Sequence, residues 1–144
     1  MNKEELINIV GKENVFDDQE TIIEYSQDMS FVPPREPFLV VKPAKASEVQ
    51  EMVKLANKTK TPLIPLSSGP PHFHGDTVPG FGGVVLDLSR MNRIILIDRT
   101  DRVAMIEPGV RFEELRSAAE KEGMRLPIPL CPRSTKSVLG SFLE

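Results

Sequence analysis

Apolar residues near the N-terminus recur at helical intervals. Leu6 and Val10 would share one face of a short helix that Asn2 can cap. The stretch ETIIEYSQ at 20–27 could form a second short helix, and the proline-rich PPREP that follows then forces an extended backbone. We therefore expect residues 1–36 to form a helical lead-in to the rest of the chain.

The pattern then changes to strand, helix, strand. The apolar run FLVVKP at 38–43 ends at a proline and predicts a buried strand. Ser47 and Gln50 have the spacing of a capping box, and the helical periodicity after them continues to about Asn57. The run TPLIPL at 61–66 predicts the next strand. Such a unit usually pairs its two strands in parallel through a right-handed crossover.

Three further strand candidates, at 82–88, 93–98 and 102–109, follow one another with only short polar turns between them. This spacing favours antiparallel strands. A helix with Phe112 on its apolar face comes next and is expected to end at Gly123. The closing segment contains three prolines and shows little helical periodicity. The predicted fold class is α+β, a βαβ unit followed by a partly antiparallel sheet with helices.

Composition narrows the class of protein. The chain has 144 residues and 40% hydrophobic content, enough for one domain with its own core. Lys and Arg total 18 against 21 Asp and Glu, with the signs interspersed, which disfavours nucleic-acid binding. Cys131 is the only cysteine, so an internal disulfide is excluded, and the charged start fits neither a signal peptide nor a membrane span. We expect a cytoplasmic protein.

The loop SSGPPHFHGDTVPGFGG at 67–83 holds five of the nine glycines and both histidines. It opens where the strand predicted at 61–66 ends. There Ser67, Ser68 and Gly69 offer small side chains and backbone N–H groups that can form a nest for an anion, most often a phosphate. A simple long connection is the other interpretation. The loop has neither a GxGxxG pattern nor the Walker lysine, so neither a usual dinucleotide fold nor an NTPase is supported.

Several segments, in one order, resemble the FAD-binding domain of the vanillyl-alcohol oxidase and p-cresol methylhydroxylase family. They are PLIPLSSGPPHFHG, GGVVLDLSRMNRIILID, VAMIEPGVRFEEL and SVLGSFLE. The resemblance implies that residues 37–144 are the N-terminal part of such a domain, truncated before its C-terminal part and the cap domain over the substrate. In the family the catalytic base and the substrate pocket lie largely in those later parts, so the catalytic residues remain unknown.

The resemblance also implies which residues bind FAD. The glycine-rich loop would cradle the pyrophosphate, although Pro70 and Pro71 lack an N–H. Leu88 and Met91 could equally be ordinary packing residues, whereas Gly109 would permit a positive φ and a close approach of the ring. The implied residues are Leu66, Ser67, Ser68, Gly69 and Pro70 for the pyrophosphate, Leu88, Ser89, Met91, Pro108, Gly109 and Val110 for adenine and ribose, and Ser137, Val138, Leu139, Gly140 and Ser141 for the ribityl chain and flavin.

Five other residues could carry chemistry but have simpler interpretations. His72 and His74 do not lie where relatives with loop-attached FAD carry their histidine, so we expect them to be solvent-exposed or near the flavin, without catalytic duty. The HxH spacing alone is a poor metal site. Cys131 is expected to be a small packed residue rather than a flavin tether. Arg133 and Lys136 could counter the phosphates or a substrate carboxylate, but ordinary exposed charges are the default.

Two functions remain open. The first is the FAD-binding part of an oxidoreductase that oxidises an aryl alcohol, a phenol or a 2-hydroxy acid by hydride transfer to flavin N5. The second, which Pro70 and Pro71 favour, is a non-catalytic binding or scaffold module that keeps the fold without stable FAD. The expected partners are FAD and, in the complete protein, a small-molecule substrate. An incomplete antiparallel sheet would also promote self-association or recruit a partner chain.

Overall fold

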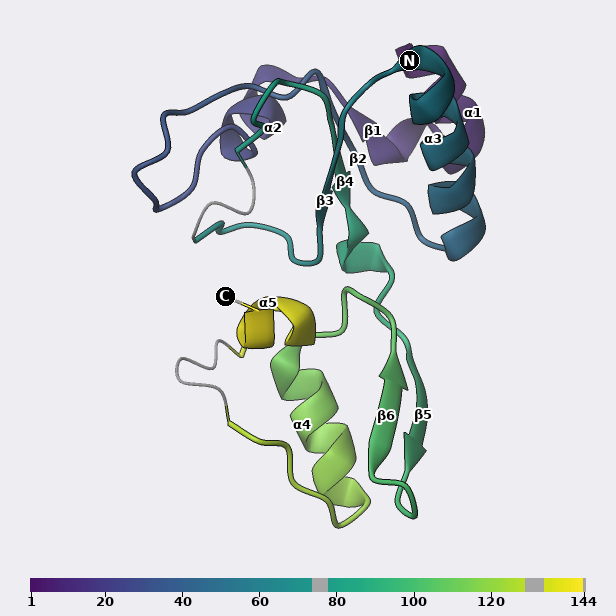
Figure 1. The fold of residues 1–144 in the computed structure, drawn as a ribbon, viewed down its shortest axis with the longest axis vertical. Helices are drawn as coiled ribbons and strands as arrows, with labels where there is room; N and C mark the ends of the chain where they lie inside the picture. The colour runs from purple at the N-terminus through teal and green to yellow at the C-terminus, as the bar shows by residue number, and fades with distance from the viewer. Residues whose placement is uncertain (74–77, 129–133, 144) are drawn as a thin grey trace.

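The structure is a computed structural model that describes residues 1–73, 78–128 and 134–143. Two parts follow one another along the long axis (Figure 1). The first is built around a four-stranded sheet, and the second consists of a hairpin and two helices. The chain passes from the first part to the second through the 3-10 helix η2 (Leu88–Arg90).

The four-stranded sheet has the order β1-β2-β4-β3. Both β2 and β3 pair in parallel with β4, and β1 runs antiparallel to β2. The predicted strand–helix–strand unit is present, but β4 lies between its two strands, so their direct pairing was wrongly predicted. The assignment of β4 to the antiparallel strands was also wrong. The strands are β1 (Val15–Phe16), β2 (Leu39–Val41), β3 (Leu63–Leu66) and β4 (Val84–Asp87).

Helices cover both faces of this sheet (Figure 1). They are α1 (Lys3–Val10), η1 (Lys12–Asn14), α2 (Gln19–Glu24) and α3 (Ala46–Thr59). Val40 and Val85 pack with Tyr25 at the end of α2, whereas Val41 and Leu86 face the opposite side and join the cluster under α1 and α3. Successive residues of a strand point to opposite faces, and here both faces are buried, which explains the uninterrupted apolar runs.

The helix starts follow the sequence only in part. Asn2 and Glu5 form the capping box of α1, which confirms the predicted cap. The capping box predicted at Ser47 is wrong, because that residue already lies inside α3 and Lys45 occupies the cap position. The Glu48 carboxylate instead accepts the N–H of the residue before the cap at 2.8 Å.

The second part begins with an antiparallel hairpin. Its elements are β5 (Ile94–Asp98), β6 (Val103–Ile106), α4 (Phe112–Lys121) and α5 (Val138–Leu143). Gly123 follows α4 with φ 70°, as expected for a left-handed helix end. The sequence did not predict α5, because six residues are too few to establish a helical period. An isolated bridge between Arg111 and Ser137 brings the starts of α4 and α5 together.

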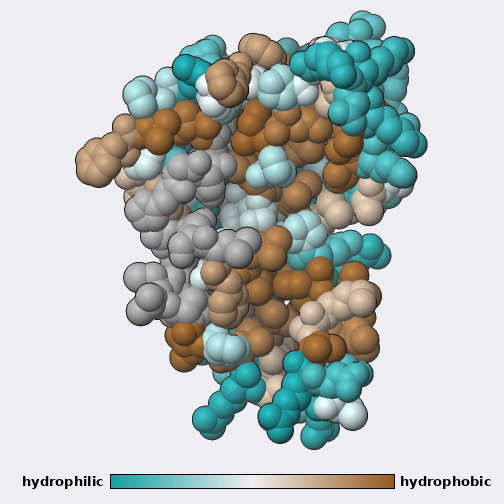
Figure 2. Space-filling model, in the orientation of Figure 1, coloured by the Kyte–Doolittle hydropathy of each residue, from teal (hydrophilic) through white to brown (hydrophobic). Residues whose placement is uncertain are grey.

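The surface is divided by polarity. Figure 2 shows hydrophilic residues over α1 and α3 and at the lower end, with hydrophobic residues gathered across the middle of the face. On the hairpin, Ile95, Leu96, Val103 and Met105 are each between 50% and 56% exposed. No helix within the described residues is both long and apolar enough to cross a membrane.

Candidate functional site

The loop predicted to bind an anion, which begins at Ser67, and η2 both leave the sheet at the carboxyl ends of its parallel strands. Leu66, the last residue of β3, pairs with Asp87, the last residue of β4. Because the two strands are parallel, the loop that begins at Ser67 and the turn that begins at Leu88 start side by side. Ligands of open α/β sheets bind beyond such carboxyl ends of strands.

A cavity of about 240 Å³ lies where these segments meet the second part of the molecule. Its lining residues are Ser67, Ser68, Gly69, Ser89, Asn92, Gly109, Arg111, Glu114, Thr135 and Ser137. Six of them were predicted to bind FAD from the sequence: Ser67, Ser68, Gly69, Ser89, Gly109 and Ser137. The fold therefore brings together residues from all three predicted groups around one space.

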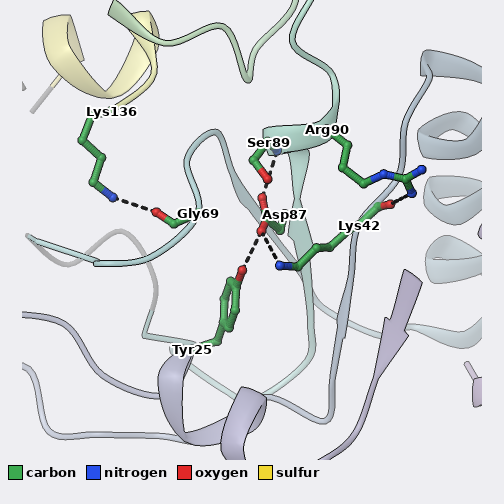
Figure 3. A network of polar contacts seen from close by, with 7 residues as sticks. All are labelled: Tyr25, Lys42, Gly69, Asp87, Ser89, Arg90 and Lys136. Carbon is green, nitrogen blue, oxygen red and sulfur yellow. Dashed lines mark hydrogen bonds and ion pairs between the residues drawn. The ribbon is translucent and has the colours of Figure 1, made fainter. Parts of the chain in front are cut away.

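Direct hydrogen bonds hold the loop to the start of α5. The hydroxyls of Ser67 and Ser137 lie 2.7 Å apart, and the Ser137 N–H donates to the Ser68 hydroxyl at 2.9 Å. The Lys136 ammonium donates to the carbonyl of Gly69 at 3.0 Å (Figure 3). Lys136 is only 2% exposed, so it is not the exposed surface charge taken as the default. It places a positive charge beside the loop.

The loop also holds the backbone donors that an anion needs. Among the described residues, the N–H groups of Ser67, Ser68 and Gly69 donate none of the backbone hydrogen bonds found in turns, loops and caps. In contrast, the N–H of Gly109 donates to the Met91 carbonyl at 2.8 Å. The N–H groups at the start of α5 are also used: those of Ser137, Val138, Gly140 and Ser141 donate within the protein.

Gly109 serves a close approach between two backbone segments. A Cβ at this position would lie 2.5 Å from the Leu88 carbonyl oxygen and 2.8 Å from the Ser89 Cα. The φ of Gly109 does not fall in the positive region, so the predicted positive φ is wrong. Glycine is needed because any side chain would meet the backbone of η2.

The other predicted residues surround the cavity without lining it. Leu66, Met91 and Val110 are buried. Leu88 packs against the core under α1 and α3, which agrees with the packing interpretation. The Ser141 hydroxyl is buried and has no hydrogen-bond partner within the described part of the chain. The remaining residues are Pro108, Val138 and Gly140, which are partly buried, Leu139, which is exposed, and Pro70, which lines a separate cavity of about 450 Å³ beside α2.

Behind the loop, Asp87 is fully buried and accepts three polar contacts (Figure 3). Its Oδ1 accepts the Ser89 N–H at 2.9 Å. Its Oδ2 accepts the Tyr25 hydroxyl at 2.5 Å and lies 3.4 Å from the Lys42 ammonium. Burial by itself would raise the pKa of Asp87, but the hydrogen bonds from Ser89 and Tyr25 and the Lys42 charge outweigh it and lower that pKa. Asp87 is therefore a charged group at neutral pH.

Tyr25 is the matching donor. Burial and then the adjacent Asp87 charge raise the pKa of the Tyr25 phenol far above its usual value, so the hydroxyl keeps its proton. Neither Tyr25 nor Asp87 was predicted from the sequence. A lone carboxylate inside the apolar run VVLDL was the available signal, because a charge buried in a strand needs partners. The cavity residues Asn92, Thr135 and the hydrogen-bonded pair Arg111–Glu114 carried no comparable signal.

His72 is 5% exposed, and its ring packs against Tyr25 with the ring centroids 4.8 Å apart. Of the two predicted alternatives for His72, solvent exposure is therefore wrong. His74, Cys131 and Arg133 lie outside the described residues. Within the described ranges, no group of three or more His, Cys, Asp or Glu side chains could hold a metal ion.

Comparisons with known proteins give a consistent family. The family model described as FAD binding domain matches residues 37–143. Glycolate oxidase subunit GlcD of Bacillus subtilis is 31% identical over 125 residues, which make up 87% of this chain and 26% of that protein.

Solved structures agree with the sequence match. The 4-ethylphenol oxidase from Gulosibacter chungangensis has a TM-score of 0.81 at 31% identity, covering 95% of this chain and 27% of that chain. p-Cresol methylhydroxylase also has a TM-score of 0.81, at 26% identity, covering 96% of this chain and 27% of that chain. The chain spans about a quarter of the length of these relatives. It belongs to the FAD-binding domain family of the vanillyl-alcohol oxidase and p-cresol methylhydroxylase type.

Proposed function

We propose that this chain supplies the pyrophosphate-binding part of an FAD-linked oxidoreductase that oxidises a hydroxylated substrate. The observation that carries the proposal is the cavity where the β3 loop, η2 and the start of α5 converge. Glycolate is a 2-hydroxy acid and 4-ethylphenol is a phenol, so the names of the relatives support either substrate class. The proposal assigns no catalytic acid or base within residues 1–144.

The residues fit a diphosphate. Ser67, Ser68 and Gly69 line the cavity with small side chains, and the described loop hydrogen bonds do not use their N–H groups, which could therefore bind phosphate oxygens. The buried Lys136 ammonium contributes positive charge next to the same loop. A cavity of about 240 Å³ is smaller than typical whole-ligand sites, which suits one part of FAD.

Different described residues would bind different parts of FAD. Ser67, Ser68 and Gly69 would bind the phosphates, and the close contact of Gly109 with η2 would form the wall on the adenine side. The buried Ser141 hydroxyl is a further group able to donate toward the flavin end. When bound, FAD supplies the acceptor for a hydride at N5. The chain's own role is to bind the cofactor and fix its orientation.

The alternative is a module that keeps the fold without stable FAD. Pro70 and Pro71 favour it, because neither has an N–H and the run of consecutive loop amides therefore ends at Gly69. Binding of FAD by the purified chain distinguishes the two functions.

The test uses two isosteric substitutions at one glycine. A Cβ on Gly69 would lie 3.8 Å from Asp87 Oδ2 and 4.0 Å from Ser89 Oγ, so a side chain can be attached without a backbone clash. Gly69→Asp would add a negative charge beside the proposed phosphates, and Gly69→Asn would add the same shape without the charge. We expect Gly69→Asp to bind FAD at least about tenfold more weakly than Gly69→Asn at low salt.

Two controls make this comparison specific. The difference between the variants should shrink as salt is raised, because screening weakens the repulsion. Affinities are measured by calorimetric titration at a temperature where both variants are folded, since the new carboxylate also faces Asp87. Equal affinity of the two variants for FAD at low salt would remove this loop from the phosphate site.

A further inference from the structure

We propose that Asp87 is a positioning residue for FAD. Together with Tyr25 and Lys42, Asp87 fixes the spacing between η2 and the start of the loop after β3, at residues 67–69. This inference rests on the function proposed above. It gives the N-terminal segment, through Tyr25 and Asp87, an influence on cofactor affinity.

The position of Asp87 in the sheet is the first step. As the last residue of β4, the carboxylate sits where the chain turns into η2, and its Oδ1 caps that turn through the Ser89 N–H. Its Oδ2 lies 3.8 Å from the place that a Cβ on Gly69 would take. One buried carboxylate therefore caps η2 and also lies next to the beginning of the loop at Gly69.

The position of the turn at Gly109, which also lines the cavity, depends on η2. The backbone at Gly109 approaches Leu88 and Ser89 so closely that it leaves no room for a Cβ, and the Gly109 N–H donates to the Met91 carbonyl. A shift of η2 would therefore move the turn at Gly109 as well. Protein interiors transmit such small displacements because they are close-packed.

Tyr25 connects the N-terminal segment to this arrangement. It lies before the start of the family match at residue 37 and is fully buried. Its hydroxyl bonds to Asp87, while its ring packs on His72 farther along the loop (Figure 3 shows the hydroxyl bond). One aromatic side chain thus contacts the carboxylate that borders Gly69 and the loop itself three residues later.

The negative charge of Asp87 supports a role in positioning the loop and η2, because a carboxylate would not attract the phosphates of FAD. A buried carboxylate beside a phosphate site repels the ligand, and the Lys42 ammonium at 3.4 Å and the Tyr25 hydroxyl offset part of this. Arg90 in turn donates to the Lys42 carbonyl at 2.7 Å and ties η2 to the end of β2. If the hydroxyl were lost, Oδ2 would keep only Lys42 and could turn toward Gly69.

The test compares Tyr25→Phe with Ile22→Val in the 144-residue chain. Tyr25→Phe removes the hydroxyl and keeps the ring against His72. Ile22→Val removes one methylene from the same buried cluster under α2. An isoleucine side chain makes no hydrogen bond, so this variant leaves the hydrogen bonds of Asp87 and the loop in place. We measure the dissociation constant for FAD and the hydrogen exchange of backbone amides in the FAD-free chain.

We expect Tyr25→Phe to weaken FAD binding about tenfold, because the released Asp87 carboxylate can turn toward Gly69 and the phosphates, and Ile22→Val to weaken it less than about threefold. Exchange should quicken in Tyr25→Phe at Ser89, Met91 and Gly109, whose N–H groups are hydrogen-bonded in and around η2, while the β5–β6 hairpin stays unchanged. Equal effects of the two variants on affinity and exchange would overturn the positioning role. If the wild-type chain binds no FAD, the proposed function fails, and the exchange pattern alone decides whether Asp87 positions these segments.

Discussion

Gly109 and Gly69 serve the same cavity for different reasons. At Gly109 a Cβ would lie 2.5 Å from a backbone oxygen that cannot move aside easily. At Gly69 a Cβ would meet only side-chain atoms at 3.8 Å and 4.0 Å, which is ordinary contact. The fold therefore requires glycine at Gly109, whereas at Gly69 the requirement, if any, comes from the ligand.

This difference predicts the behaviour of alanine substitutions. Gly109→Ala should lower the free energy of unfolding by about 1–3 kcal/mol, because its methyl group forces η2 away. Gly80→Ala is the matched control, since nothing lies within 4 Å of a Cβ there. Chemical denaturation of both variants checks the prediction. Equal stability of the two variants would mean that η2 yields without cost.

For single residues, the sequence predicted features that depend on near neighbours in the chain, but not features that depend on residues distant in the sequence. Asn2 was identified because a cap and its partner lie three residues apart. The burial of Lys136 was not predicted, because it depends on Gly69, which is distant in the sequence. Nor does the sequence show that Gly109 faces η2, since that contact exists only after the turn after β4 has met the turn after β6.

At the scale of elements, the pattern predicted most strands but not their order. Apolar runs marked β2, β3 and β4 correctly. The residues of β2 and β4 are all buried, whereas β3 lies at the edge of the sheet and buries only Leu66. The place of β4 between β2 and β3 is decided by packing on both faces, which residue periodicity does not record. The two-residue strand β1 is too short for any periodic signal.

The hairpin gives a prediction about elements. Val103 and Met105 lie two positions apart on β6, with half of each side chain exposed, so they share one face of a two-stranded sheet. We expect this face to promote self-association, and Val103→Thr combined with Met105→Thr to reduce it while keeping strand propensity. Sedimentation velocity at micromolar concentration measures the effect.

The control for this prediction is Val53→Thr, which changes an exposed apolar residue on α3, away from the hairpin. It should leave the sedimentation unchanged. A wild-type chain that sediments as a monomer, or equal effects of the α3 and hairpin variants, would contradict the role of this face.

At the scale of the whole molecule, residues of both parts line the cavity, and neither part alone forms it. The sheet contributes the amide-bearing loop and η2, and the second part contributes the turn at Gly109 and the start of α5. Solved relatives about three and a half times as long contain this fold, at TM-scores of 0.81. The fold thus brings both parts of the molecule to the proposed cofactor site, while the choice of substrate belongs to the proposed complete enzyme.

The most direct test of this account is a titration of the purified chain with FAD, followed by equilibrium dialysis and visible absorption of the flavin. We predict saturable, non-covalent binding that reaches one FAD for each chain and is competed by ADP, which carries the same diphosphate and adenine. Absence of saturable binding by a folded chain, or binding that ADP does not reduce, would contradict the assignment of this cavity to FAD.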